Sequence, residues 1–129
     1  MQRSWRCRAI FALAGLGLLA GCDNAPPPLS PERRAELAET LQPDDARLAD
    51  LYTQSCRTCH GDPQNTAPLT GDYPAWKPRL DKGIDTLTEN AINGFKGMPP
   101  LGLCMACDAA DFEALIRFMA QSKAYEESQ

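Results

Sequence analysis

The chain is poor in several features that large classes of proteins need. It has one histidine in 129 residues, so two imidazoles cannot hold one metal ion. Lys and Arg number 13 against 17 Asp and Glu, and this acidic balance argues against nucleic acid as a partner, because that partner needs a basic face. No segment alternates apolar and polar residues as a β-strand does, so an all-α fold is expected.

Long apolar runs are also missing, since residues 9–20 are too few to span a bilayer as a mature helix. Arg3, Arg6 and Arg8 precede this run, as in a secretory signal peptide. The run ends in Leu19-Ala20-Gly21-Cys22, which resembles the lipobox of bacterial lipoproteins and predicts cleavage before Cys22 with a lipid on its sulfur. The alternative is an ordinary secretory signal with a coincidental cysteine. Asp23 resembles a signal for retention at the inner membrane, so we expect a periplasmic, lipid-anchored protein there.

Removing residues 1–21 leaves 108 residues, with ten basic and all 17 acidic side chains and a net charge of −7. This length predicts one small domain, residues 44–129, behind a lipid-anchored tether, residues 22–43. Three prolines at 26–28 favour extended polyproline II. Ser30-Pro31 then predicts the start of a short helix over 31–41.

Cys56-Arg57-Thr58-Cys59-His60 carries the most specific chemistry. Two thiols at this spacing can each form a thioether to a haem vinyl group, and the adjacent imidazole can bind the iron. A zinc site would need two more ligands, and a thioredoxin-like dithiol would need a strand–helix unit that the sequence does not predict. The motif therefore predicts one covalently attached haem c, with Cys56 and Cys59 as its thioethers and His60 as an axial ligand.

Four further patterns place the expected helices. Asp44 can cap a helix that carries Leu48, Leu51 and Tyr52 and runs into Cys56. Residues 61–83 read as a loop with one short helical turn at most. Another helix is expected from a capping box at Thr86 and Glu89 to Gly94 or Gly97. A last helix starts at Asp108-x-x-Asp111, with an apolar stripe of Phe112, Leu115, Ile116 and Met119.

The iron needs a sixth ligand or an open site, and the remaining candidates are methionines. Met119 lies on the apolar stripe, where packing is the expected role, and Met105 lies inside a tight Cys-x-x-Cys turn. Met98 stands 38 residues after His60 and precedes Pro99-Pro100, a stiff loop that can hold one side chain still. We therefore predict a His60/Met98 pair, which leaves no iron position free for substrate and raises the reduction potential.

An ordered set of short motifs resembles class I c-type cytochromes, and among them the bacterial cytochrome c5 group. The resemblance covers residues 44–121 and implies the small all-α cytochrome c fold. One departure is Leu48, at a position where this class often carries glycine, which suggests a shifted helix crossing near Ala49. The matching motifs are Leu51-Tyr52, Asn65-Thr66-Ala67-Pro68, Trp76-Lys77-Pro78-Arg79, Gly83-Ile84-Asp85-Thr86-Leu87, Asn93-Gly94, Met98-Pro99-Pro100 and Cys104-Met105-Ala106-Cys107.

The same resemblance suggests roles for five further residues. It implies a structural disulfide between Cys104 and Cys107, which suits an oxidising compartment, although a redox-active dithiol stays possible. It implies that the Pro68 carbonyl accepts the Nδ1–H of the haem-binding histidine. Trp76 and Arg79 can reach the haem propionates as donors, or serve as core packing and a surface charge respectively.

Two functions follow from these residues. The first is a monohaem carrier that passes single electrons between periplasmic or membrane redox proteins. The second is a haem enzyme, or a sensor of peroxide or a diatomic gas, in which Met98 dissociates. The stiff loop at Met98 and the lack of a second histidine favour the carrier.

Overall fold

The computed structural model describes residues 28–121 and 123–127, so the predicted signal peptide and Cys22 lie outside the described residues. Within that part of the chain every regular element is helical, apart from an isolated bridge between Phe95 and Met98. A π-helical segment is labelled η1 and a turn-like 3-10 segment η2. The elements are α1 (Pro31–Thr40), α2 (Ala46–Leu51), η1 (Tyr52–Cys56), α3 (Arg57–His60), α4 (Tyr73–Leu80), α5 (Ile84–Asn93), η2 (Pro100–Leu103), α6 (Ala109–Met119) and α7 (Lys123–Glu127).

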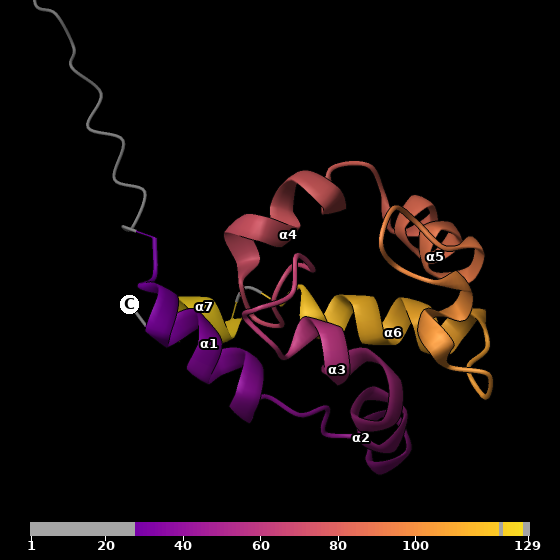
Figure 1. Cartoon of the computed structure of the whole chain (residues 1–129), viewed down its shortest axis with the longest axis horizontal. Coiled ribbons are helices and arrows are strands. Elements are labelled where there is room, and N and C mark those ends of the chain that lie inside the picture. The colour runs from indigo at the N-terminus through magenta and orange to yellow at the C-terminus, as the bar shows by residue number, and fades with distance from the viewer. Residues whose placement is uncertain (1–27, 122, 128–129) are drawn as a thin grey trace, which may run out of the picture.

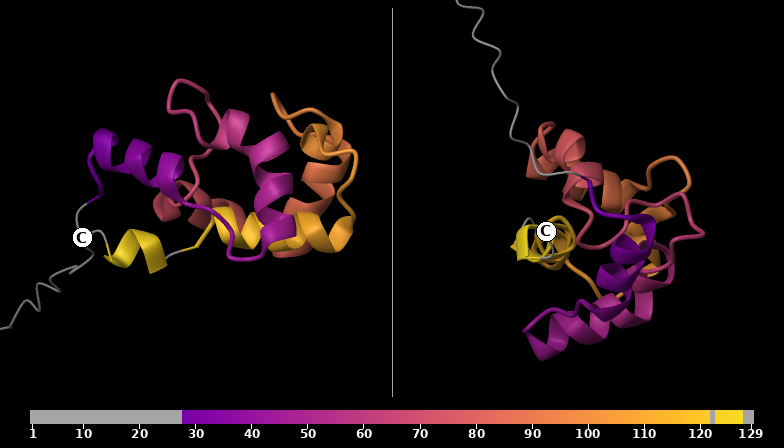
Figure 2. Two further views of the ribbon diagram at one scale, coloured as in Figure 1. Left: turned by 90° about the horizontal axis from the view of Figure 1, so that it is seen from below. Right: turned by 90° about the vertical axis from the view of Figure 1, so that its left-hand side faces the viewer.

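Helix α6 forms the centre of the arrangement and runs along the long axis of the molecule in Figure 1. Its most extensive contact is with α5, and α2 crosses it as well. The first described residues and α7 lie together at one end, while the segment around η2 lies at the other, as the left view of Figure 2 also shows. The molecule therefore has two distinct poles.

A single apolar core joins the helices. The predicted stripe on α6 is buried in it, and Tyr52 and Trp76 bring in the haem-motif helix and α4. Half-buried side chains around it include Cys56 and Met98, so both halves of the predicted haem site contact this core. Its buried members are Tyr52, Trp76, Leu87, Ala91, Cys104, Phe112, Leu115, Ile116, Met119 and Ala120.

The predicted helix after the proline run is present as α1, with Ser30 as its N-cap and proline in its first turn. It does not stand apart as a spacer. Leu37 and Ala38 are buried, and Arg34 forms an ion pair with Asp72 of the main domain. The described part of the expected tether, from Pro28 on, thus contains a helix that packs on the domain.

Two of the three predicted helix starts were wrong. The helix before the haem motif is capped by Asp45, whose carboxylate accepts from Leu48 N, and not by Asp44. The capping box at Thr86 is absent because α5 already begins at Ile84, so the Thr86 hydroxyl lies in the first turn and donates to Lys82 O. The last helix does begin with a capping box, formed by Asp108 and Asp111 as predicted.

Helix α4 occupies part of the region expected to be a loop. Its first turn contains Pro74, where no intrahelical N–H bond is needed, and it also contains Pro78 in its interior. Two prolines in eight residues are untypical of a helix, so the sequence pattern did not predict α4. The helix nevertheless places Trp76 in the core. No helix among the described residues combines the length and the apolar character that crossing a membrane requires.

Candidate functional site

The two cysteines of the haem motif lie on a continuous helical path. Segment η1 is π-helical and delivers Cys56, and α3 follows with Cys59 and His60. Such π segments occur often at functional sites because they change which side chains face the interior. Both thiols are free; Cys56 is half-buried and Cys59 is exposed. They are thus available for two thioether bonds.

His60 is buried at the end of α3, and its ring orientation is fixed. Its Nδ1 lies 2.8 Å from Pro68 O. Because a carbonyl oxygen only accepts, Nδ1 carries the hydrogen and Nε2 is the nitrogen with a free lone pair. This is the contact that the resemblance implies, and it leaves one ring nitrogen to bind a metal.

Burial sets the protonation of this site. It lowers the pKa of His60, partly opposed by the bond to Pro68 O, so the imidazole is neutral at neutral pH. Burial also raises the pKa of the Cys56 thiol to about 11. A neutral imidazole is the form that ligates iron.

Trp76 and Arg79 occupy different surroundings. The Trp76 indole is buried, stacks on the His60 ring with centroids 5.6 Å apart, and donates from Nε1 to Leu69 O at 2.8 Å. Its single N–H is therefore used within the protein, which favours the core-packing alternative over the propionate contact. Arg79 is exposed and its guanidinium donates to Ala75 O. Its propionate role stays a prediction.

Sequence reasoning missed Thr70, which is fully buried behind the haem motif. Its backbone N–H donates to His60 O at 2.8 Å. Its hydroxyl accepts from the buried Tyr52 hydroxyl at 2.9 Å. Tyr52 stands four residues before Cys56, but nothing in the local pattern marks Thr70 as its partner. We call residues 68–72 the proximal segment, since they hold His60 in place.

The Met98 segment, residues 94–107, is built differently. Phe95 and Met98 exchange two backbone hydrogen bonds of 3.0 Å each. Met98 is half-buried against the core, and a Cβ added at Gly102 would lie 2.9 Å from its Cε. Lys96, Leu101 and Leu103 all have positive φ. The backbone is therefore confined tightly around one thioether.

The other two methionine candidates lie in less suitable places. Met119 is buried in the core on α6, where packing occupies it. Met105 is 82% exposed and so has no fixed surroundings. Of the three predicted candidates, Met98 alone combines partial burial with a confined backbone.

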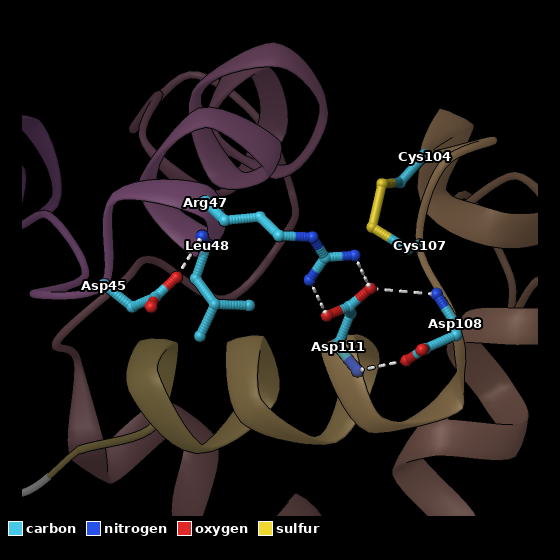
Figure 3. A network of polar contacts seen from close by, with 7 residues as sticks. All are labelled: Asp45, Arg47, Leu48, Cys104, Cys107, Asp108 and Asp111. Carbon is cyan, nitrogen blue, oxygen red and sulfur yellow. Dashed lines mark hydrogen bonds and ion pairs between the residues drawn. A yellow bond between two sulfur atoms is a disulfide. The ribbon is translucent and has the colours of Figure 1, made fainter.

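Cys104 and Cys107 form a disulfide at the end of the Met98 segment. Figure 3 shows this disulfide beside the start of α6. There the Arg47 guanidinium donates hydrogen bonds from two nitrogens to the Asp111 carboxylate. The second of these bonds is 2.8 Å long, and Asp108 N donates to the same carboxylate at 3.0 Å. These contacts lower the pKa of Asp111 to about 2. They also tie α2 to α6, while the helix crossing near Ala49 stays a prediction.

These residues fit a covalently attached haem better than the alternative sites. Two free thiols, a neutral buried imidazole with one open nitrogen and a confined thioether are the ligand set of a c-type haem. Within residues 28–121 and 123–127, no three His, Cys, Asp or Glu side chains gather as a metal cluster, so a tetrahedral zinc site has no ligand set there.

Comparison with known families decides the class. The family described as cytochrome C oxidase, cbb3-type, subunit III matches residues 43–119. The chain belongs to this family. The match begins after α1 and ends with α6, so both the haem motif and Met98 lie inside it while α1 and α7 lie outside.

Relatives of the cytochrome narrow the class to the c5 group. The cytochrome c5 of Azotobacter vinelandii is 37% identical over 73 residues, covering 55% of this chain and 88% of the relative. That of Ectopseudomonas mendocina is 38% identical over 78 residues, covering 58% and 90%. The cytochrome c-555 of Chlorobaculum tepidum is 39% identical over 85 residues, covering 62% and 79%.

A solved structure supports the fold as well as the class. A chain in an electron transfer complex of nitrite reductase with cytochrome c superposes with a TM-score of 0.53 at 35% identity, covering 60% of this cytochrome and 95% of that chain. The protein is a class I c-type cytochrome of the c5 group. It therefore carries one covalently bound haem c and acts in electron transfer.

Proposed function

We propose that this cytochrome is a monohaem electron carrier with His60 and Met98 as the two axial ligands. The observation that supports it best is the 2.8 Å contact between His60 Nδ1 and Pro68 O, which leaves Nε2 as the ring nitrogen that would bind the iron. Thioethers at Cys56 and Cys59 would hold the haem against the core that also contacts Met98.

The residues around the site serve a reaction in which one electron arrives and one leaves. When bound, the haem supplies the iron couple that alternates between the ferric and ferrous states. His60 stays neutral and hydrogen-bonded, so it takes up no proton during the cycle. Pro99 and Pro100 stiffen the chain beside Met98, which limits ligand rearrangement when the charge changes. Small movement of the ligands when the charge changes favours fast electron transfer.

The alternative is an enzyme or a gas or peroxide sensor that opens the iron by releasing Met98. The confinement of Met98 between its bonds to Phe95 and its contact with Gly102 disfavours that release. The two readings differ in a direct measurement. Reduced wild-type protein should refuse carbon monoxide at neutral pH and should titrate as a one-electron couple, whereas ready carbon monoxide binding would favour the sensor.

The thioether assignment has its own test. After denaturing electrophoresis, haem stain should remain on the protein band of the wild type. Replacing Cys56 or Cys59 by alanine should greatly reduce the holoprotein yield, because each variant loses one of the two covalent links. Haem that acid acetone extracts from the wild type would contradict the assignment.

We further propose that the cytochrome works in the bacterial periplasm, held by lipid on Cys22 to the inner membrane. The support is the Arg-flanked apolar run, the lipobox and Asp23. Several acyl chains anchor far more firmly than the marginal binding of one chain. Fatty-acid labelling should mark the wild type and miss Cys22→Ser; an unlabelled, fully soluble wild type would overturn the anchor.

The proposed partners are periplasmic or membrane redox proteins, one donating and one accepting the electron. The similar chain in a complex with nitrite reductase supports this class of partner. Affinity capture from solubilised membranes, with a haem-free Cys56→Ala/Cys59→Ala variant as the control bait, should recover redox proteins with the wild type alone.

A further inference from the structure

Helix α1 lies outside the residues that match the family, 43–119, yet it packs directly on the proximal segment. Its contacts reach this segment at two residues, and a further contact reaches α3. Leu37 and Leu41 touch Gly71, Arg34 pairs with Asp72, and Glu39 O accepts from Arg57 of α3 at 2.8 Å. The helix thus bridges the haem-motif helix and the segment that orients His60.

The contact at Gly71 is close enough to require glycine. Gly71 has φ +81°, and a Cβ added there would lie 2.7 Å from Leu41 Cδ1 and 3.5 Å from Leu37 Cβ. The apolar side chains of α1 and the residue that follows it therefore lie against bare backbone. Any shift of α1 changes the support of this backbone directly.

The contact at Asp72 adds a charged anchor. Arg34 Nη1 lies 3.3 Å from Asp72 Oδ2, and the Asp72 side chain is only 7% exposed. The adjacent Arg34 Nε is buried with no hydrogen-bond partner among the described residues. Arg34 Nε thus loses hydration at the point where the side chain reaches Asp72. The ion pair with Asp72 is the polar attachment of α1 to the proximal segment.

Gly71 and Asp72 lie within four residues of Pro68, whose carbonyl oxygen accepts from His60, so contacts at Gly71 and Asp72 bear on the position of His60. Gly71 N donates to Met119 O, Thr70 N donates to His60 O, and Pro68 O accepts from His60 Nδ1, each at 2.8 Å. An outer-shell hydrogen bond of this kind raises the basicity of a ligating imidazole. A more basic imidazole favours ferric iron and lowers the reduction potential.

We propose that α1 is a positioning strap for the proximal ligand, acting through Arg34–Asp72 and Leu41–Gly71 to keep Pro68 O on His60 Nδ1. The strap sets the reduction potential of this cytochrome and protects the proximal segment from opening. Arg34 and Leu41 are thus positioning residues. The inference rests on His60 being an iron ligand, as proposed above.

The test compares full-length holoproteins carrying Arg34→Ala, Leu41→Ala, Arg34→Lys or Arg33→Ala. Arg33 is the matched control, since it lies on the same helix and its guanidinium pairs with Glu36 of α1. Two quantities are measured: the midpoint potential by optical titration, and amide hydrogen exchange at Thr70, whose N–H is bonded to His60 O. Neither quantity depends on the activity of a partner.

We expect Arg34→Ala and Leu41→Ala to raise the midpoint potential. We also expect them to speed Thr70 exchange by about tenfold, which corresponds to an opening free energy lower by roughly 1.4 kcal/mol. Arg34→Lys should restore most of both, and Arg33→Ala should match the wild type. Potentials equal to that of Arg33→Ala would overturn the strap, even if exchange became faster. A wild type that lacks histidine ligation in its spectrum would instead refute the proposed function.

Discussion

The two sides of the proposed haem site are held by different forces. The proximal segment is fixed by directional hydrogen bonds and one ion pair that reach η1, α3, α4, α6 and α1. The Met98 segment has Lys96 as its only charged side chain. Prolines, positive φ angles, a backbone pair and a disulfide confine it.

This difference separates two tasks. Hydrogen bonds to the His60 region set the orientation and electronic character of a ligand that stays in place. Restriction of the backbone around Met98 limits motion without adding charge, so the soft thioether keeps an apolar setting that favours ferrous iron. The proximal segment and the Met98 segment therefore depend on different interactions, and each can be altered by substitutions of its own residues.

Removing the Met98 thioether should have the largest effect. Met98→Ala should abolish the long-wavelength charge-transfer band of oxidised protein, lower the reduction potential and allow carbon monoxide or cyanide to bind. Met105→Ala is the matched control because that side chain is 82% exposed. A variant at Met98 that keeps the band would show that another group is the sixth ligand.

On the proximal side, Thr70→Val should destabilise the fold by up to about 3 kcal/mol, because it leaves the buried Tyr52 hydroxyl without its acceptor. Burial already raises the pKa of Tyr52, so the hydroxyl stays protonated and needs a partner. Adding Tyr52→Phe should recover most of the loss in denaturant unfolding. A double variant as unstable as the sum of the two single ones would contradict a direct bond.

Loss of the disulfide should cost less. The Cys104→Ala/Cys107→Ala variant should lose about 2 kcal/mol of unfolding free energy, as expected for so short a loop. Reduced wild type should show a similar loss in the same urea titration, since both treatments remove the same cross-link. If the spectroscopic signals of histidine ligation also changed, the Met98 segment and the proximal segment would not be independent.

The smallest effect concerns Arg47 and depends on pH. The pKa of Asp111 is lowered to about 2 in the folded protein, against roughly 3.9 in an unfolded chain. The ion pair therefore stabilises the fold at neutral pH, and this contribution is lost as pH falls from about 4 towards 2. Arg47→Gln should be less stable than wild type at neutral pH, with the gap closing in acid.

The control for Arg47 is Arg117→Gln, which breaks an exposed pair with Glu113 one helical turn away. Exposed ion pairs of this kind contribute little to the free energy of unfolding. Urea unfolding measured across the pH range should therefore show a smaller change for Arg117→Gln at neutral pH. Equal changes in the two variants would mean that Asp111 gains nothing from its buried position.

Local chemistry made much of the site predictable. The haem motif and the Asp108–Asp111 capping box depend on residues within a few positions of one another, so their spacing is visible in the sequence. The bond between Thr70 and Tyr52 joins residues 18 apart. That between Arg47 and Asp111 joins residues 64 apart, and no periodicity encodes either pairing.

Helix α4 was missed for a related reason. Its interior Pro78 lowers local helix propensity, and burial of Trp76 compensates through contacts that only the folded chain provides. The packing of α1 was missed because Arg34 and Leu37 find their partners at residues 71–72. Tertiary contacts thus decided the elements for which the local sequence was weakest.

The position of both ends of the described chain at one pole of the molecule has a practical consequence for attaching it to surfaces. The described chain begins before α1 and ends after α7 at one pole, and the η2 region lies at the opposite pole (Figures 1 and 2). A linker joined to either end would turn the Met98 pole outward. On an electrode or a bead, this geometry would present the same face of every molecule to solution.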